Sequence, residues 1–322
     1  MFFESFKITG AGIGQIIILG GVGFFLVKRD ILKKEALHFL SRLVIEVTLS
    51  AMIFCQLMSN FSFSAYVNWW VFPILSAAVT SAGLLIGLIF SVFIKELQKK
   101  LQFLSLITFQ NSAFIPIVLV AALLPKESAD KMMVYLFLFL LGFNAAILSF
   151  GVYLLTFTKA KKFEINSLFN PPVIATIASL VFVYFGLPRF VPEFVFRPLK
   201  MIGDCTVPLS MFIVSANLAE IKLRHIDKAA MFFTVLAKLV ILPLLGVLLV
   251  VKFKIDCLIG LLIVMQLAVP SATLLSVIMT HHKREDFLIS QGVFFTHIAS
   301  IITVPLFLSL YFALVGWPGC VR

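Results

Sequence analysis

The feature that most constrains this chain is a series of long apolar runs that recur from one end of it to the other. Each run is about as long as the roughly 20 residues that a helix needs to cross the hydrocarbon core of a bilayer. Only helices and closed barrels satisfy their backbone hydrogen bonds in lipid, and these runs lack the alternation of barrel strands. The fold class is therefore all-α, in a polytopic membrane protein without a separate soluble domain.

Charged residues, proline and glycine divide the chain into ten expected transmembrane helices. They cover residues 8–27, 39–59, 69–94, 103–124, 132–157, 171–189, 198–219, 229–251, 255–280 and 290–316. Composition agrees, because 61% of the residues are hydrophobic, only 13% are charged and the mean hydropathy is +1.11. Soluble domains of this size do not have such a composition.

The basic residues indicate the sides of the membrane. The net charge is +11, but the Lys and Arg residues form short clusters between apolar runs, so nucleic acid is not an expected partner. Of the 26 Lys and Arg residues, 16 fall in alternate connections, at 28–42, 95–100, 158–168, 220–228 and 281–286. The positive-inside rule assigns these connections to the cytoplasm and both termini to the outside of the cytoplasmic (inner) membrane.

Rare features recur at a nearly constant spacing. Residues of the same kind recur 158 positions apart: Glu46 and Asp204, Thr48 and Thr206, Phe24 and Phe182, and Phe54 and Phe212. Gln110 and Gln266 recur 156 positions apart. An odd number of helices per repeat inverts the second copy. We therefore expect two inverted five-helix repeats, residues 1–157 and 171–322, joined by a cytoplasmic loop at 158–170.

The fourth and ninth runs each contain a polar stretch with proline near the middle. Proline removes a backbone donor and clashes with the preceding turn, which frees carbonyls that lipid cannot satisfy. Two broken helices that cross at the midplane bring positive half-helix ends together, which suits a carboxylate, although proline kinks are also frequent without any such role. The candidate substrate-binding residues are Gln110, Asn111, Ser112, Pro116, Gln266, Pro270 and Ser271.

Three charged residues lie inside apolar runs, where inserting a charge costs about 2.5–3.5 kcal/mol. Glu46 and Asp204 are expected to face the protein interior as proton- or cation-coupling groups; the alternative is a structural role, with Asp204 within a turn of Thr206 and Glu46 near the membrane boundary after Arg42. Lys238 needs an acidic residue or an anionic ligand nearby, unless its long stem lets the ammonium group reach the interface. These three residues are the candidates for coupling or charge pairing.

Other features favour structure over chemistry. Asn144, Asn217 and His297 are single polar residues on apolar helices, where interhelical hydrogen bonds are expected. The four cysteines show no spacing typical of a disulfide framework or a metal site, and enzyme motifs do not occur, so no cofactor or metal is expected. Glycines in the first run allow close packing within the chain or against a second protomer, which leaves a homodimer open.

Short motifs in the second half carry a resemblance to a known family. They are Asn170-Pro171-Pro172, Gly186-Leu187-Pro188, Ile202-Gly203-Asp204, Val207-Pro208-Leu209-Ser210, Leu239 to Pro243, Ala268-Val269-Pro270-Ser271 and Thr303-Val304-Pro305-Leu306. In their order and spacing the chain resembles the auxin efflux carrier family, which includes plant auxin carriers and bacterial permeases proposed for malonate or malate. The connection 158–168 lacks the long insertion of the plant carriers, so a bacterial-type permease is the better match.

The resemblance implies an elevator-type carrier. Helices 1, 2, 6 and 7 would form a scaffold domain, and helices 3–5 and 8–10 a mobile transport domain whose site lies where helices 4 and 9 cross. Family motif residues map onto Asn111, Pro116 and Pro270. Ser50 stands where many members have proline, and Ala113-Phe114-Ile115 replaces the glycines usual near the helix 4 break, departures that bear on the substrate more than on the fold.

The function we expect is a secondary active transporter, or permease, for a small organic anion, a carboxylate. Proton coupling, sodium coupling and uncoupled transport are all open. The main alternative is a non-transporting membrane receptor or scaffold on the same fold. An intramembrane hydrolase is a weaker one, because Gly203-Asp204 matches half of an aspartyl protease site and the paired aspartate has no counterpart.

Overall fold

The structure is a computed structural model that describes residues 2–156, 169–221, 226–281 and 287–316. Helices account for nearly all of the regular structure in these residues, where one isolated bridge is the sole strand-like pairing. Seven helical segments of the same part of the chain are long and apolar enough to cross a membrane. The expected class, a polytopic all-α membrane protein, is thereby confirmed.

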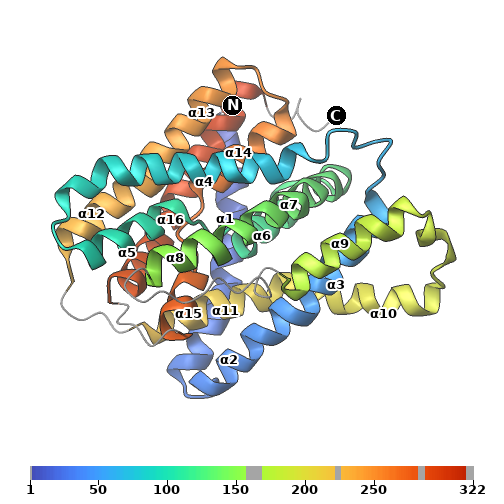
Figure 1. The fold of residues 1–322 in the computed structure, drawn as a ribbon, viewed down its shortest axis with the longest axis horizontal. Coiled ribbons are helices and arrows are strands. Elements are labelled where there is room, and N and C mark those ends of the chain that lie inside the picture. Colours follow the sequence, from blue (N-terminus) through green and yellow to red (C-terminus); the bar gives the residue numbers. More distant parts are fainter. Residues whose placement is uncertain (1, 157–168, 222–225, 282–286, 317–322) are drawn as a thin grey trace.

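The first five apolar runs are helical, some of them in several pieces (Figure 1). The first two are α1 (Phe2–Lys28) and a continuous segment of α2 (Lys34–Leu43), the π-helical turn η1 (Val44–Leu49) and α3 (Ser50–Asn60). The next three are α4 (Val71–Phe90) with the short 3₁₀ turn η2 (Ser91–Phe93), the pair α5 (Leu97–Thr108) and α6 (Phe114–Leu123), and the segment α7 (Lys126–Ala146), η3 (Ile147–Gly151) and α8 (Val152–Thr156).

The last five runs are helical as well. They comprise α9 (Pro171–Tyr184) with the 3₁₀ turn η5 (Leu187–Phe190), the pair α10 (Glu193–Asp204) and α11 (Thr206–Glu220), the segment α12 (Lys228–Leu236), η6 (Ala237–Ile241) and α13 (Leu242–Lys252), the pair α14 (Cys257–Ala268) and α15 (Leu274–His281), and α16 (Phe287–Val315). The seventh run begins at Glu193, before the expected residue 198, because α10 continues through Pro198.

Side-chain caps begin three of these helices. Asn170 accepts a hydrogen bond from a backbone N–H of the first turn of α9, and Pro171 follows it at a position where a missing N–H costs nothing. Asp227 caps α12 and Asp256 caps α14 in the same way. Each cap satisfies donors that a helix end leaves free.

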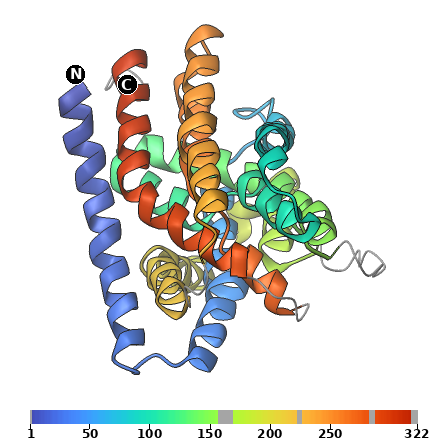
Figure 2. The same ribbon diagram turned by 90° about the vertical axis from the view of Figure 1, so that its left-hand side faces the viewer.

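Helices far apart in the sequence pack side by side. α1 packs along α11, and α3 lies beside α9 and α10 (Figure 1). A Cβ at Gly23 of α1 would collide with the backbone of Phe212, so the expected close packing of the first helix occurs within this chain. Figure 2 shows the first residues of α1 and the last turns of α16 at the same end of the molecule. A 2.7 Å hydrogen bond between the hydroxyls of Thr9 and Ser309 joins the two helices there.

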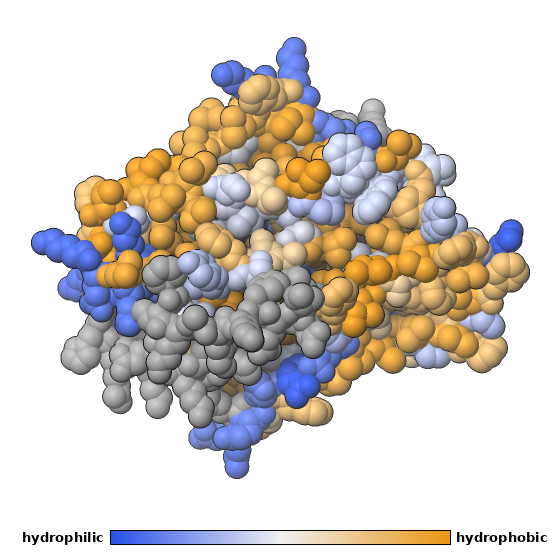
Figure 3. All heavy atoms as spheres, viewed as in Figure 1, coloured by the Kyte–Doolittle hydropathy of each residue, from blue (hydrophilic) through white to orange (hydrophobic). Residues whose placement is uncertain are grey.

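The surface is that of a protein in contact with lipid. In the view of Figure 3 apolar residues cover most of the surface, and hydrophilic residues gather toward its edges. Large apolar side chains stand exposed on the outer helices, including Ile18, Phe25, Val92, Tyr184 and Ile302. A soluble protein would not leave so much contiguous apolar surface in water.

Several of the basic connections lie close to one another, as expected of loops on the same side of a membrane. Lys28, at the end of α1, donates a 3.2 Å hydrogen bond to the carbonyl of Ala219, near the end of α11. Lys99 and Asp227 line one cavity of about 300 Å³ between the connections 95–100 and 220–228. The connection 158–168, residues 222–225 and residues 282–286 are outside the described part of the chain.

One expectation about the cysteines is wrong. Cys55 and Cys205 are free thiols, as expected, but Cys257 at the start of α14 is in a disulfide bond. Spacing along the sequence carried no sign of this bond, because a disulfide depends on how the chain brings two positions together in space. Cys257 follows the connection 253–256, which the charge pattern assigns to the outside, where disulfides persist.

Candidate functional site

Both helices that were expected to be broken are broken. α5 ends at Thr108 and α6 begins at Phe114, while α14 ends at Ala268 and α15 begins at Leu274. Val269, which precedes Pro270, has extended backbone angles, as a residue before proline prefers. Pro116 lies inside the first turn of α6, where its missing N–H would have had no helical partner. The two prolines thus act differently: Pro270 lies in the break itself, and Pro116 helps to restart the helix.

The two breaks cross and pair with each other. Gln110 and Ser271 form an isolated antiparallel bridge. The N–H of Asn111 donates to the carbonyl of Pro270 at 2.8 Å, and the N–H of Ala272 donates to the carbonyl of Phe109 at 3.0 Å. This short ribbon satisfies backbone groups that a helix break would leave unpaired in an apolar interior.

Two predicted side chains also tie the crossing together. Ser271 Oγ donates to the carbonyl of Leu106 at 2.7 Å, and Gln266 Nε2 donates to the carbonyl of Ser112 at 3.1 Å. Each bond therefore runs from a side chain of one broken helix to the backbone of the other. The structure thus brings together six of the seven predicted site residues, and the seventh, Pro116, lies three residues into α6.

α16 supplies a third side of the crossing. His297 Nδ1 lies 2.7 Å from the carbonyl of Val293, so this nitrogen carries the proton and Nε2 is left to accept. Asn111 Nδ2 donates to that Nε2 at 3.4 Å, which orients the Asn111 amide. His297 is thus the interhelical hydrogen-bond partner that the sequence predicted. Thr296, which accepts from the N–H of Ser271 at 3.3 Å, was missed because a threonine in an apolar helix ordinarily bonds back to its own helix.

Several buried polar atoms at the crossing have no hydrogen-bond partner among the described residues. Both atoms of the Gln110 amide are unpaired although the residue is only 1% exposed. Ser112 Oγ and Gln266 Oε1 are unpaired as well, and both residues are at most 2% exposed. Leaving a buried polar group unpaired costs about 1–3 kcal/mol, so such a cluster is typical of a site that a polar ligand completes.

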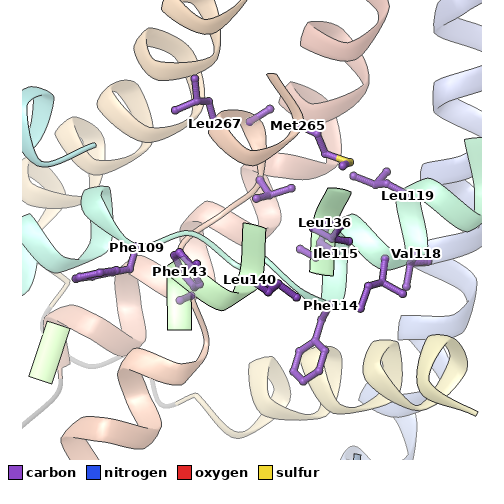
Figure 4. Packing of buried hydrophobic residues seen from close by; sticks show 14 of the residues in the cluster. Phe109, Phe114, Ile115, Val118, Leu119, Leu136, Leu140, Phe143, Met265 and Leu267 are labelled. Carbon is purple, nitrogen blue, oxygen red and sulfur yellow. The ribbon is translucent and has the colours of Figure 1, made fainter. Parts of the chain in front are cut away.

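Apolar side chains enclose this polar cluster. Figure 4 shows Phe109 and Phe143 on one side of the α5–α6 break, and Ile115 and Leu140 closer to the start of α6. All four are buried or nearly so. A low-dielectric enclosure strengthens hydrogen bonds to a charged ligand, and it raises the free-energy cost of leaving the polar groups without hydrogen-bond partners.

Lys238 reaches the crossing from another helix. It lies in η6, a π-helical turn that precedes Pro243, and it is only 1% exposed. Its ammonium nitrogen donates to the carbonyl of Ile107 at 3.0 Å, in the last turn of α5. Within the described residues no carboxylate forms an ion pair with it. Lys238 therefore neither extends to the interface nor has the acidic partner that we expected, because its stem points into the protein.

The two intramembrane carboxylates are placed differently from the expectation. Glu46 pairs with Arg42 at 2.9 Å and Asp204 approaches Lys200 at 3.7 Å, each one helical turn away. Their side chains are 42% and 65% exposed, so neither faces the interior of the chain. Thr48 and Thr206 follow these carboxylates by two residues, and their hydroxyls form a buried hydrogen bond at 3.1 Å that is not one of the contacts of the crossing.

Comparisons with known proteins agree with this architecture. The family described as membrane transport protein matches residues 12–167 and 155–308 of the chain. An uncharacterized transporter of Methanocaldococcus jannaschii is 25% identical over 300 residues, which cover 90% of this chain and 95% of that protein. The family match spans both halves, including both helix breaks.

Proposed function

Because the chain belongs to the membrane transport protein family, the auxin efflux carrier family, we propose that it is a secondary active transporter for a small organic anion, a carboxylate. The observation that carries this proposal is that the buried Gln110 amide and Ser112 Oγ, both at the crossing, have no hydrogen-bond partner among the described residues. In a carrier these groups would bind the substrate in the middle of the protein, between the two halves of each broken helix.

The chemistry of the crossing favours an anion. Gln110 Nε2 and Ser112 Oγ are free donors, and α6 and α15 both start at the crossing with the positive ends of their dipoles. A carboxylate accepts hydrogen bonds in several directions, and charge-assisted bonds are stronger than neutral ones. A neutral solute would leave the buried ammonium group of Lys238 without a counter-charge.

The movement we propose is of the elevator type, with ten transmembrane helices in two inverted repeats. The helices α1, α3, α9, α10 and α11 pack on one another and would form the scaffold. The broken pairs, with α4, α7, α12, α13 and α16, pack around the crossing and would form the transport domain. The bond between Thr48 and Thr206, which are 158 residues apart, supports the repeat, since equivalent positions meet at a two-fold axis.

Several further features of the carrier are part of the same proposal. Substrate moves across the cytoplasmic membrane, with the basic connections inside and both termini outside. The coupling ion is a proton, taken up by Asp204 or Glu46, or sodium held by freed carbonyls and Gln266. A homodimer would form through the scaffold.

Transport in proteoliposomes tests the proposal. Purified protein is reconstituted and offered radiolabelled monocarboxylates, dicarboxylates and aromatic acids, with or without a pH gradient. We expect saturable uptake of at least one anion above that of empty liposomes. Saturable binding without flux would instead identify a receptor or scaffold, and chemical turnover of an acid ester or peptide would identify a hydrolase.

A further inference from the structure

A second property of the crossing concerns the charge that Lys238 brings to it. We propose that the ammonium group of Lys238 takes the place of a coupling metal cation, so that the site carries its own positive charge and binds anions without sodium. This inference rests on the proposed transport function and narrows its coupling to a proton or to none.

The first step is the position of the ammonium group. Carbonyls at the C-terminal end of a half-helix carry partial negative charge, and in carriers with broken helices such ends coordinate the coupling cation. At the end of α5 the carbonyl of Leu106 accepts from Ser271 Oγ at 2.7 Å, and that of Ile107 accepts from Lys238 Nζ at 3.0 Å. The hydroxyl of Ser271 and the side-chain nitrogen of Lys238 therefore already occupy these carbonyls.

The second step is the charge around Lys238. The helix end supplies only about half a negative charge, so part of the charge of a protonated Lys238 has no counterpart among the described residues. The described carboxylates that form ion pairs are Glu46, Glu96 and Asp204, and none of them pairs with Lys238. In the same part of the chain no group of three His, Cys, Asp or Glu side chains could hold a metal ion. An anionic substrate would complete the charge balance, whereas a second cation would worsen it.

The third step is how the fold holds the lysine there. Pro243 lacks an N–H and displaces the turn before it, which accounts for the π-helical turn that contains Lys238. Gly83 of α4 lies against the same helix end, since a Cβ there would come within 2.9 Å of the Ile107 carbonyl oxygen. The end of α5 is thus packed from one side and bound to the ammonium group from another.

The test measures thermal unfolding of the full-length protein in NaCl, KCl, choline chloride and methylammonium chloride at equal ionic strength. A cation that binds only the folded state raises the melting temperature, because it stabilises that state by RT ln(1 + c/Kd), where c is the cation concentration. We expect the wild-type melting temperature to be the same in all four salts. Lys238→Ala should be less stable in choline chloride and should recover part of the loss in NaCl or methylammonium chloride, which can enter the vacated position.

Lys252→Ala, at the exposed end of α13, is the matched control and should show no cation-specific recovery. A sodium-specific rise in the wild-type melting temperature would overturn the inference, as would a folded Lys238→Ala protein that responds to none of the cations. If Lys238→Ala does not fold, anion uptake by the wild type in proteoliposomes tests the inference instead, with choline replacing sodium on both sides of the membrane. An unchanged uptake rate supports the inference, and a tenfold lower rate contradicts it. Absence of any anion uptake by the wild type would contradict the proposed transport function. The melting temperatures in the four salts would still test whether Lys238 takes the place of a cation.

Discussion

At the scale of single residues, the crossing separates side chains that maintain the structure from side chains that are free to bind. Ser271 and Gln266 Nε2 are used in bonds to the backbone of the opposite helix. Gln110 and Ser112 Oγ have no such bond. Asn111 is intermediate, because His297 takes one of its two amide hydrogens and leaves the other for a ligand.

Asn111 therefore provides the sharpest test of the binding site. A charge-assisted hydrogen bond contributes about 1.5–3 kcal/mol, so we expect Asn111→Ala to weaken anion binding by about ten- to a hundredfold in a calorimetric titration. Asn144→Ala, in α7 outside both breaks, should leave the affinity within a few-fold of the parent. Equal affinities of the two variants would argue against a site at the crossing.

A substitution at Asp204 tests proton coupling separately from anion binding. If Asp204 carries the coupled proton, Asp204→Asn should abolish uptake driven by a pH gradient and preserve exchange of labelled for unlabelled anion, because the substitution removes a protonatable group that is not among the contacts of the crossing. The variant should fold normally, since the contact with Lys200 is exposed and such pairs contribute about 0–1 kcal/mol. Gradient-driven uptake that equals the parent's would assign Asp204 a structural role.

At the scale of elements, the breaks in the fourth and ninth runs are stabilised by their neighbours. α4 and α16 pack against α5, and both contribute contacts within a few residues of the breaks. At Gly83 this support comes from backbone atoms, because the backbone of Ile107 and Thr108 lies where a side chain would begin. α4 thus supports the end of α5 at the crossing.

Gly83→Ala should consequently destabilise the protein. The added Cβ would meet the Ile107 carbonyl oxygen at 2.9 Å and Thr108 Cα at 3.0 Å, and such overpacking typically costs about 1–3 kcal/mol. We expect a lower melting temperature and weaker anion binding. Gly21→Ala is the matched control, because nothing lies within 4 Å of that position, and its melting temperature should be unchanged or slightly higher. A Gly83→Ala protein as stable as the Gly21→Ala control would show that α4 can shift away from α5 without a loss of stability.

At the scale of the whole molecule, the arrangement of helix ends is consistent with one cytoplasmic face. The ends of α1 and α11 meet through Lys28 and Ala219, and the connections 95–100 and 220–228 share a cavity. The disulfide at Cys257 lies after a connection expected on the opposite side. The orientation that the charge pattern predicts stays a prediction.

Labelling with an impermeant thiol reagent on intact cells tests this orientation. Lys99→Cys and Glu127→Cys both place a thiol at an exposed position, at the start of α5 and of α7. We expect labelling from outside at position 127 and protection at position 99, with both labelled after the membrane is permeabilised. The reverse pattern would invert the whole topology.

The sequence alone determined that this protein lies in a lipid bilayer, that its fold is helical, and where two of its helices break. Those features follow from local chemistry: apolar runs as long as a bilayer is thick, and proline with polar residues in the middle of two of them. The sequence also predicted that the two breaks cross, but the pairing of Gln110 with Ser271 and the hydrogen bonds between the breaks needed the tertiary structure.

Only the tertiary structure decided the roles of the charged residues. In the sequence Glu46, Asp204 and Lys238 all lie within apolar runs, Lys238 as the single charge of its run and the two carboxylates four residues after Arg42 and Lys200. The fold leaves the two carboxylates on the surface beside basic residues and buries the lysine against the end of α5. Which way such a side chain points depends on the rotation of its helix against neighbours far away in the chain, and local sequence does not contain that information.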